Sequence, residues 1–557
     1  MTRISPSNTN LFEERAENLS QSELKDWTVL SEAEKQIVQK LTGPGAKLIS
    51  GPRGSGKSTL LRTAYFQLSR ARTALPIYVN YSKALALEPL FHTHADALLL
   101  FRQWVLAKIL VGLRDTLKLW SLTEEPGIKS VIERASVYIR ALEAGTAPES
   151  IQDLSPSGVA SLLQEIGAGQ SVARTVLLLD DAAHAFSVKQ QREFFEVFRE
   201  LRSREVSAKA AIYPGVTSFS PSFQVGHEAE VIEAWFRPDR AGYLQTMREI
   251  ATKRFPDFVK RLGATANDNL DVLALASFGL PRGFVGLISD VEDELQTSSG
   301  IRRTMLNSID VHADVVRTVF ANVADRLPRF KNYIELGRSF ESAGRAAIRA
   351  FNRGKALRSK TATIALAEPT PDEFERALRF MEYAGLIRRI EDLSKGVKGN
   401  YRRYLLHYAC IISGNALSLG KNYRLSDIVE ALQRPNAHAL VKTKPQTLLG
   451  SDFIARCTLA MPPCPQCGTQ RMTEDQKFCM SCGKELRAAS IYLELLKSSV
   501  TKLPLPQRKI QALQSAGINE IQQVLSDETQ RFRKPGSSIG PVWANRILTV
   551  AEEYVSV

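Results

Sequence analysis

The sequence predicts an α/β fold with a parallel sheet, because two apolar segments each end in polar residues. Leu48 and Ile49 form a short apolar run before the loop Gly51–Ser58, and an apolar helical pattern follows. A second run, Thr175–Leu179, is apolar or β-prone throughout and ends in two aspartates. Unbroken apolar strands are typical of parallel sheets covered on both faces, and ligands bind at the carboxyl ends of such strands. Both polar segments are therefore expected at one edge of a single sheet.

The loop Gly51–Ser58 reads G-x-x-x-x-G-K-S, the spacing of a phosphate-binding loop (P-loop). Its glycines allow the backbone to curl so that N–H groups point at phosphate oxygens, and the helix start adds a partial positive charge. Lys57 would reach the β- and γ-phosphates, and Ser58 would bind Mg²⁺. A glycine-rich turn could match by chance, but the strand before it and the helix after it favour the P-loop. The expected nucleotide-binding residues are Gly51, Gly54, Ser55, Gly56, Lys57, Ser58, Thr59 and Asp180.

Two acidic residues end the second apolar run and complete the predicted site. Asp180 is expected to orient Mg²⁺ through water, and Asp181 is the candidate general base for an attacking water. Aspartate is shorter than the glutamate often found there, so slow hydrolysis is expected. A third strand is predicted over Ala208–Thr217, with Thr217 or Ser218 as a sensor of the γ-phosphate.

A helix break is predicted at Gly279–Arg282, where G-L-P-R follows the apolar segment Val272–Ala276. Glycine ends a helix readily and proline starts one, so the next helix would begin here. Arg282 would then point at the phosphates from a helical lid.

A helix–strand–turn–strand unit is predicted between residues 372 and 406. Asp372–Ala384 has one apolar helical face and ends at Gly385, and strands are expected over 386–390 and 401–406. Residues 326–410 contain 18 Lys and Arg but 9 Asp and Glu, while the whole chain carries a net charge of +14. A helix followed by two strands and a basic turn is the shape of a DNA-binding wing, although the same unit could serve protein contacts alone. The candidate phosphate contacts are Lys395, Lys398, Arg402 and Arg403.

Four cysteines near residue 470 have the spacing of a zinc ribbon. They form C-x₂-C…C-x₂-C with 11 residues between the pairs, and a glycine follows each pair. Four thiolates make a closed, structural zinc site, and a chain without a signal core favours a reducing compartment over disulfides. The predicted ligands are Cys464, Cys467, Cys479 and Cys482, whereas Cys410 and Cys457 are expected in the core.

The last segment, residues 502–557, is predicted to be a small all-α module of helix–hairpin–helix type. Its net charge is only +2, so DNA binding and a protein-adaptor role remain equally open. No run of 18 apolar residues and no signal-like N-terminus is found in the 557 residues, so no membrane partner and a cytoplasmic location are expected.

Taken together, the segments Gly51–Thr59, Leu177–Asp181, Ile212–Thr217 and Gly279–Arg282 resemble the AAA+ ATPases of the origin-recognition and replication-initiator branch, and the related STAND ATPases. The pair Asp180–Asp181 is more similar to the STAND ATPases, whereas the lid arginine Arg282 is more similar to the initiators. The resemblance implies a P-loop αβα ATPase core with helical lid and winged helix, besides the zinc ribbon and the all-α module. The expected organisation is an N-terminal arm near the adenine (1–42), core (43–235), lid (236–300), helical and winged-helix region (301–425), connector (426–460), ribbon (461–487) and C-terminal module (488–557).

These expectations combine into an AAA+ molecular switch that binds and hydrolyses ATP and associates with DNA. ATP and Mg²⁺ are expected between core and lid, together with a structural zinc ion and double-stranded DNA as partner. A protein partner is expected as well, and self-association is left open. The alternative is a STAND-like sensor or scaffold, for example in anti-phage defence, with negligible turnover. A third hypothesis is a transposition-type target selector that forms ATP-dependent filaments on DNA.

Overall fold

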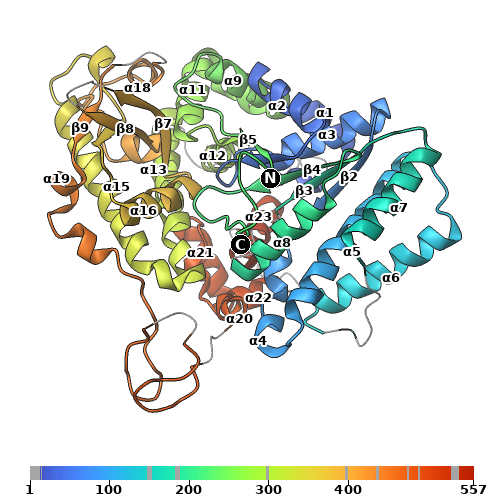
Figure 1. Ribbon diagram of the computed structural model, residues 1–557. Helices are drawn as coiled ribbons and strands as arrows, with labels where there is room; N and C mark the ends of the chain where they lie inside the picture. The colour runs from blue at the N-terminus through green and yellow to red at the C-terminus, as the bar shows by residue number, and fades with distance from the viewer. Residues whose placement is uncertain are drawn as a thin grey trace.

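The computed structural model describes residue 13 and residues 15–146, 148, 154–181, 188–295, 300–394, 399–434, 438–472, 476–486, 490–527 and 539–556. Its first half contains a five-stranded sheet, ordered β2-β3-β4-β1-β5, in which all neighbours are parallel (Figure 1). The strands are β1 (Lys47–Ser50), β2 (Leu75–Asn80), β3 (Thr175–Asp180), β4 (Val206–Ile212) and β5 (Glu230–Glu233).

Helices cover both faces of this sheet, which explains why β3 is apolar at every position before its aspartate. Val176 and Leu178 pack in one apolar cluster with residues of α2 and α3. Leu177 and Leu179 belong to the larger core formed with α5, α7 and α8. This arrangement confirms the predicted α/β class. The helices around the sheet are α1 (Gln21–Trp27), α2 (Glu32–Thr42), α3 (Lys57–Ala71), α4 (Leu90–Thr93), α5 (Ala97–Leu119), α6 (Pro126–Glu143), α7 (Pro156–Gly169) and α8 (Val188–Leu201).

The lid consists of α9 (Tyr243–Arg254), α10 (Pro256–Leu262), α11 (Ala266–Ala276) and α12 (Pro281–Glu294). The predicted break between α11 and α12 is present, and Gly279 there has a φ of +78°. A Cβ at this position would lie 1.8 Å from the carbonyl oxygen of Phe236. Only glycine therefore fits this turn, which sets the direction in which α12 starts.

A second sheet of four strands, ordered β7-β8-β6-β9, forms the wing region. Helix α16 precedes the antiparallel hairpin β7–β8, as the sequence predicts. Its elements and flanking helices are α13 (Ile301–Ala321), α14 (Val323–Arg326), α15 (Lys331–Asn352), β6 (Thr363–Ala367), α16 (Asp372–Tyr383), β7 (Ile387–Ser394), β8 (Asn400–Leu406), α17 (Tyr408–Ser413), α18 (Leu425–Leu432), β9 (Val441–Thr443) and α19 (Pro445–Leu449).

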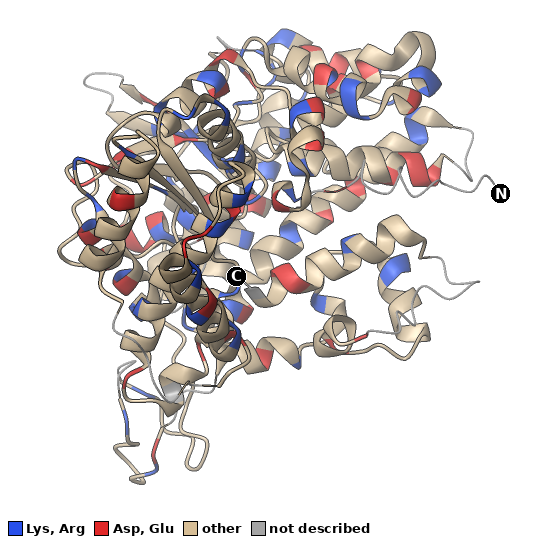
Figure 2. Cartoon of the chain, turned by 90° about the vertical axis from the view of Figure 1, so that its right-hand side faces the viewer, with Lys and Arg blue, Asp and Glu red and all other residues tan. Residues whose placement is uncertain are grey.

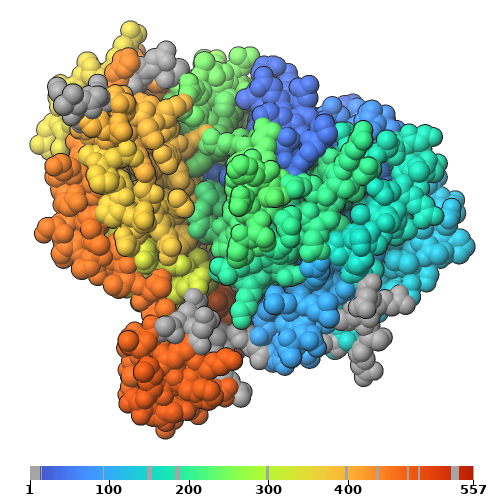
Figure 3. Space-filling view, viewed as in Figure 1, coloured from blue at the N-terminus to red at the C-terminus, as the bar shows by residue number. Residues whose placement is uncertain are grey.

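The C-terminal helices pack into the middle of the molecule. They are α20 (Ile491–Leu496), α21 (Gln507–Ser515), α22 (Ile521–Leu525) and α23 (Pro541–Ser556). Figure 1 shows them in red between the parallel sheet and the wing region, whereas the cysteine-rich segment before them projects from the body in Figure 3. Among the described residues, no helix is long and apolar enough to cross a membrane.

Candidate phosphate-binding site and cysteine cluster

The loop between β1 and α3 is shaped by its glycines. At Gly51 a Cβ would lie 2.6 Å from the hydroxyl of Ser55, and at Gly54 it would lie 3.1 Å from the Cβ of Arg282. Gly54 and Gly56 have φ values of +78° and +92°, which side-chain-bearing residues rarely adopt. The backbone thus curls tightly before α3, and Gly56 caps the helix.

Lys57 begins α3 and is buried at the centre of the loop. Its Nζ donates to the carbonyl oxygens of Gly51, at 2.7 Å, and Pro52, at 2.9 Å. The same Nζ lies 3.7 Å from the ring centroid of Tyr213. Burial lowers the pKa of Lys57 to about 7, although the nearby carboxylates of Asp181 and Asp180 act in the opposite direction. An anion in this loop would favour the charged form of the lysine.

Asp180 ends β3 and is fully buried beside the loop. The hydroxyl of Tyr78 donates to its Oδ2 at 2.8 Å, and Ser58 contributes a second side-chain hydrogen bond. Burial, together with the carboxylates of Asp181 and Glu17, raises the pKa of Asp180 to about 7. The structure thus brings Asp180 next to the predicted magnesium-binding Ser58.

Asp181 follows β3 with a φ of +54° and lines the cavity above the loop. The hydroxyl of Tyr213 donates to its Oδ1 at 2.6 Å. Tyr213 comes directly after β4, on the strand next to β3 in the sheet. The two side chains therefore reach the cavity from neighbouring strand ends.

Thr217 does not lie in this cavity, because β4 ends at Ile212, five residues before it. Its hydroxyl accepts a hydrogen bond from the backbone N–H of Tyr213 at 2.9 Å and closes a turn. Proline at 214 cannot donate to a neighbouring strand, and Gly215 turns the chain with a φ of +80°. The expected strand over 208–217 is therefore too long, and Tyr213 occupies the position by the loop that Thr217 was expected to hold.

Arg282, at the start of α12, lines the same cavity and contacts the loop. Its backbone N–H lies 3.5 Å from the carbonyl oxygen of Gly54. Its guanidinium donates to Glu553 of α23 at 2.6 Å. The structure brings the lid arginine to the P-loop as predicted, but pairs it with a carboxylate that the sequence analysis missed.

The N-terminal arm supplies the apolar side of the cavity. Leu24, Trp27 and Leu30 line it, together with Ile250 of α9. Arg62 of α3 holds the arm by donating to the carbonyl oxygen of Leu19 at 2.8 Å. An apolar slot beside a phosphate-binding loop is the arrangement that a nucleotide base and its phosphates require.

The residues present fit a phosphate chain and a magnesium ion. The buried hydroxyl of Ser55, at the edge of the cavity, has no hydrogen-bond partner among the described residues and can donate to a phosphate oxygen. Ser58 and Asp180 offer a hydroxyl and a carboxylate, the oxygen ligands that Mg²⁺ prefers. Thr59 lines the cavity, whereas Gly51 shapes the loop from beneath it.

The predicted wing contacts are already engaged in ion pairs where the structure describes them. Arg402 pairs with Glu368 at 2.6 Å and also with Glu375, and Arg403 lies 3.8 Å from Glu391. Lys395 and Lys398 fall outside the described residues. On the side of the molecule in Figure 2, Lys and Arg positions are interspersed with Asp and Glu positions. Phosphate binding by Arg402 or Arg403 would have to compete with these carboxylates.

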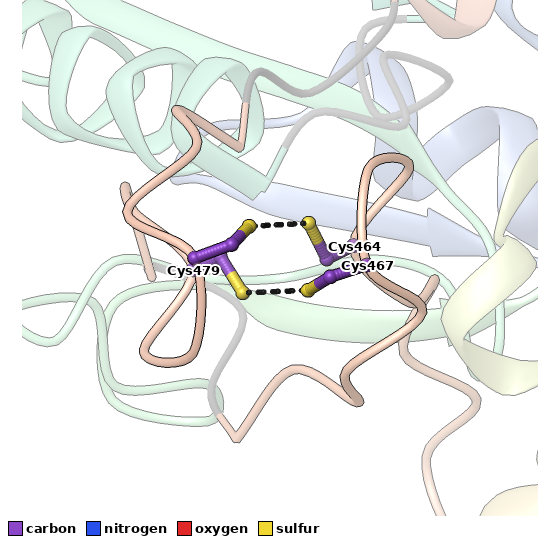
Figure 4. Close-up of side chains that lie close together, drawn as sticks. Cys464, Cys467 and Cys479 are labelled. Carbon is purple, nitrogen blue, oxygen red and sulfur yellow. Dashed lines mark hydrogen bonds between the residues drawn. The ribbon is translucent and has the colours of Figure 1, made fainter.

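The four predicted zinc ligands come together in the projecting segment, and Figure 4 labels three of them, Cys464, Cys467 and Cys479. The sulfur atoms of Cys464 and Cys482 are 3.6 Å apart, and those of Cys467 and Cys479 are 3.5 Å apart. All four sulfurs lie within 4.8 Å of one another. Zinc–sulfur bonds of about 2.3 Å in a tetrahedron place sulfurs roughly 3.8 Å apart, so the cluster fits such an ion.

Two matching turns build this cluster. Gly468 and Gly483 adopt φ values of +73° and +67°, and their N–H groups donate to the carbonyl oxygens of Cys464 and Cys479. The apolar cluster here contains only two of the cysteines and Leu486. So small a core contributes little stability, and a bound metal ion would supply what it lacks. Cys410 and Cys457 are buried elsewhere, as expected.

Comparisons with known proteins add little to this geometry. No protein-family model and no curated protein matches the chain. Among solved structures, it is similar to a Walker-type ATPase of Pyrococcus abyssi, at 12% identity and a TM-score of 0.40, over 73% of this chain and 100% of the other.

Two ORC structures are similar as well. The ORC1 protein of Aeropyrum pernix in complex with DNA gives 17% identity and a TM-score of 0.29, over 74% of this chain and 96% of the other. The Drosophila ORC bound to DNA gives 12% identity and a TM-score of 0.27, over 72% of this chain and 98% of the other. These proteins are of the kinds that the sequence motifs resemble.

Proposed function

We propose that this chain binds ATP with magnesium and hydrolyses it slowly, as a nucleotide-controlled switch associated with DNA. The observation that carries the proposal is the P-loop between β1 and α3, with buried Lys57 facing Asp180 and Asp181 from the adjoining part of the sheet. The apolar arm residues would contact the base, and the loop N–H groups with Lys57 would bind the phosphates.

Each polar side chain has a task that follows from its position. Ser58 and Asp180 would hold magnesium, which when bound offsets phosphate charge. Asp181 would accept a proton from water, while Tyr213 fixes its orientation through the 2.6 Å hydrogen bond. Arg282 would stabilise negative charge on the γ-phosphate from the lid.

DNA association is the less constrained part of the proposal. It is supported by the surplus of nine basic residues over 326–410 and by the β7–β8 hairpin behind helix α16. Because Arg402 and Arg403 pair with carboxylates, other basic residues of this region would make most of the proposed DNA contacts. Contacts of this kind position a protein on DNA without reading its sequence.

A second candidate is a sensor or scaffold with negligible turnover. It is favoured by the pairing of Asp181 with Tyr213 and of Arg282 with Glu553, which engages both groups that hydrolysis needs. The deciding measurement is the rate of phosphate release with and without duplex DNA at one fixed salt concentration. Stimulation by DNA supports the switch, whereas a flat, near-zero rate with intact ATP binding supports the sensor.

We also propose that the four cysteines bind one structural zinc ion. Cys479→Ser is expected to lower the zinc content of the purified protein from about one ion per chain to nearly none, because a structural site needs all four thiolates. Hydrogen exchange over residues 461–472 and 476–486 should rise, since Cys464, Cys479 and Leu486 form the only small core there among the described residues. Elemental analysis measures the metal.

The matched control is Cys457→Ser, a buried cysteine outside the cluster. Its zinc content should equal that of the wild type. Unchanged zinc in the Cys479 variant would contradict the assignment.

A further inference from the structure

A carboxylate from the C-terminal helix α23 reaches the cavity beside the P-loop. Glu553 lines this cavity, and its side chain is only 17% exposed. Its oxygens lie 2.6 Å from Arg282, 3.5 Å from Arg53 and 3.6 Å from Arg15. One carboxylate thus meets three guanidinium groups.

These three arginines come from separate parts of the proposed nucleotide site. Arg53 belongs to the P-loop, Arg282 starts the lid helix α12, and Arg15 comes from the N-terminal arm. All three line the cavity. Guanidinium groups bind carboxylates and phosphates in the same geometry, because both anions present paired oxygens. A triphosphate in the loop and Glu553 would therefore compete for the same cations.

Helix α23 also forms hydrogen bonds with the lid helix α12. Arg546 donates to Asp290 at 2.7 Å, and the indole of Trp543 donates to Asp293 at 3.1 Å. Both aspartates lie on α12, the helix that carries Arg282. The position of Glu553 is thus coupled to the position of the lid arginine, and α23 also packs against α20 and α22 of the C-terminal module.

We propose that α23 is an internal gate of the nucleotide site, with Glu553 holding the phosphate-binding arginines until a triphosphate displaces it. This inference rests on the proposed ATP binding. Displacement of Glu553 would loosen α23 from the loop and change the placement of the C-terminal helices. Binding of a nucleotide would in this way change the arrangement of the helices that follow the cysteine cluster.

Glu553→Gln tests the gate, because glutamine keeps the shape of the side chain and removes its charge. The variant is expected to bind ATP about tenfold more tightly than the wild type, since one charge-assisted competitor is lost. Arg546→Gln should act in the same direction by loosening α23 while leaving the three arginines intact. Titration with a fluorescent ATP analogue measures the affinities, and thermal melting checks that each variant is folded.

The matched control is Glu552→Gln, one residue earlier on the same helix. Glu552 pairs with Arg15 at 2.7 Å, and its side chain is 46% exposed. Because Glu553 still holds Arg53 and Arg282 in this variant, its affinity for ATP should stay within about twofold of the wild type, as expected for a partly exposed ion pair.

A second measurement follows the helix itself. In the wild type, ATP should increase hydrogen exchange in α23, whereas Lys57→Ala should show no such change. Equal or weaker ATP binding by the Glu553 variant, with unchanged protection of α23, overturns the gate and leaves ATP binding standing. If neither the wild type nor the Glu553 variant binds ATP, the proposed function fails and the gate fails with it.

Discussion

Replacing Lys57 with alanine is expected to lower the affinity for ATP at least about 100-fold. The lysine would make charge-assisted hydrogen bonds to two phosphates, each contributing roughly 1.5–3 kcal/mol. Its Nζ already sits at the centre of the loop, within 2.9 Å of two backbone carbonyl oxygens. Equilibrium titration with a fluorescent ATP analogue measures the loss. Wild-type affinity in the Lys57 variant would remove the P-loop from the proposed site.

Lys47→Ala is the control for this variant. Lys47 lies at the opposite end of β1 and pairs with Glu230 at the surface, 2.6 Å away. It does not line the cavity. Its replacement should leave ATP affinity unchanged, so a loss shared by both variants would indicate general damage to the sheet.

The pH dependence of binding gives a second test of Lys57. Because burial lowers the pKa of Lys57 to about 7, the lysine is charged below this pH and loses its proton above it. Phosphate binding needs the charged form, so affinity measured without magnesium should fall as the pH rises from 7.5 to 9. The dependence should disappear in the Lys57 variant, which has no group there to titrate.

Asp181→Asn is expected to keep ATP binding and to lower the hydrolysis rate by about 100-fold or more, the usual contribution of a general base. Asparagine tolerates the left-handed conformation that the φ of +54° requires, so the backbone should be undisturbed. It can still accept a hydrogen bond from Tyr213, but its amide cannot take a proton from water. Phosphate release and nucleotide affinity are measured on the same preparation.

Asp392→Asn serves as the control, because Asp392 lies half-exposed on β7 and pairs with Arg389. It should hydrolyse ATP at the wild-type rate. If Asp181→Asn were equally active, another group would have to be the base. The proposed ATP binding would survive that result.

The local parts of the site could be read from the sequence because local patterns determine them. The order of apolar run, glycine-rich loop and helix predicts that Lys57 lies at the start of a helix, directly after the loop. The unbroken apolar run of β3 places Asp180 and Asp181 at a strand end. The break at Gly279 follows from the same kind of signal, because glycine ends a helix readily and proline starts one.

Tyr213 was missed although the rule that located the aspartates also applies to it. It directly follows the last residue of β4, at the carboxyl end of a strand next to β3. The strand was expected to run on to Thr217, so the residue that reaches the cavity from this strand end was placed too late in the sequence. Pro214 is the local signal that could have shortened it.

Glu553 and the ion pairs of Arg402 had no local signal at all. Glu553 lies 500 residues from Arg53 in the sequence, and nothing in its own helix distinguishes it from neighbouring Glu552. Arg402 reads as a free wing residue because its partners, Glu368 and Glu375, come from other elements. Pairings between distant segments depend on tertiary packing, which periodicity and composition do not encode.

The separation between Arg53 and Glu553 also bears on how the molecule matures. Because a ribosome makes Arg53 500 residues before Glu553, the nascent chain carries its glycine-rich loop long before the carboxylate that contacts it. The lid, the wing and the cysteine cluster all emerge in between. The cavity is therefore incomplete until α23, which carries Glu553, packs beside the P-loop.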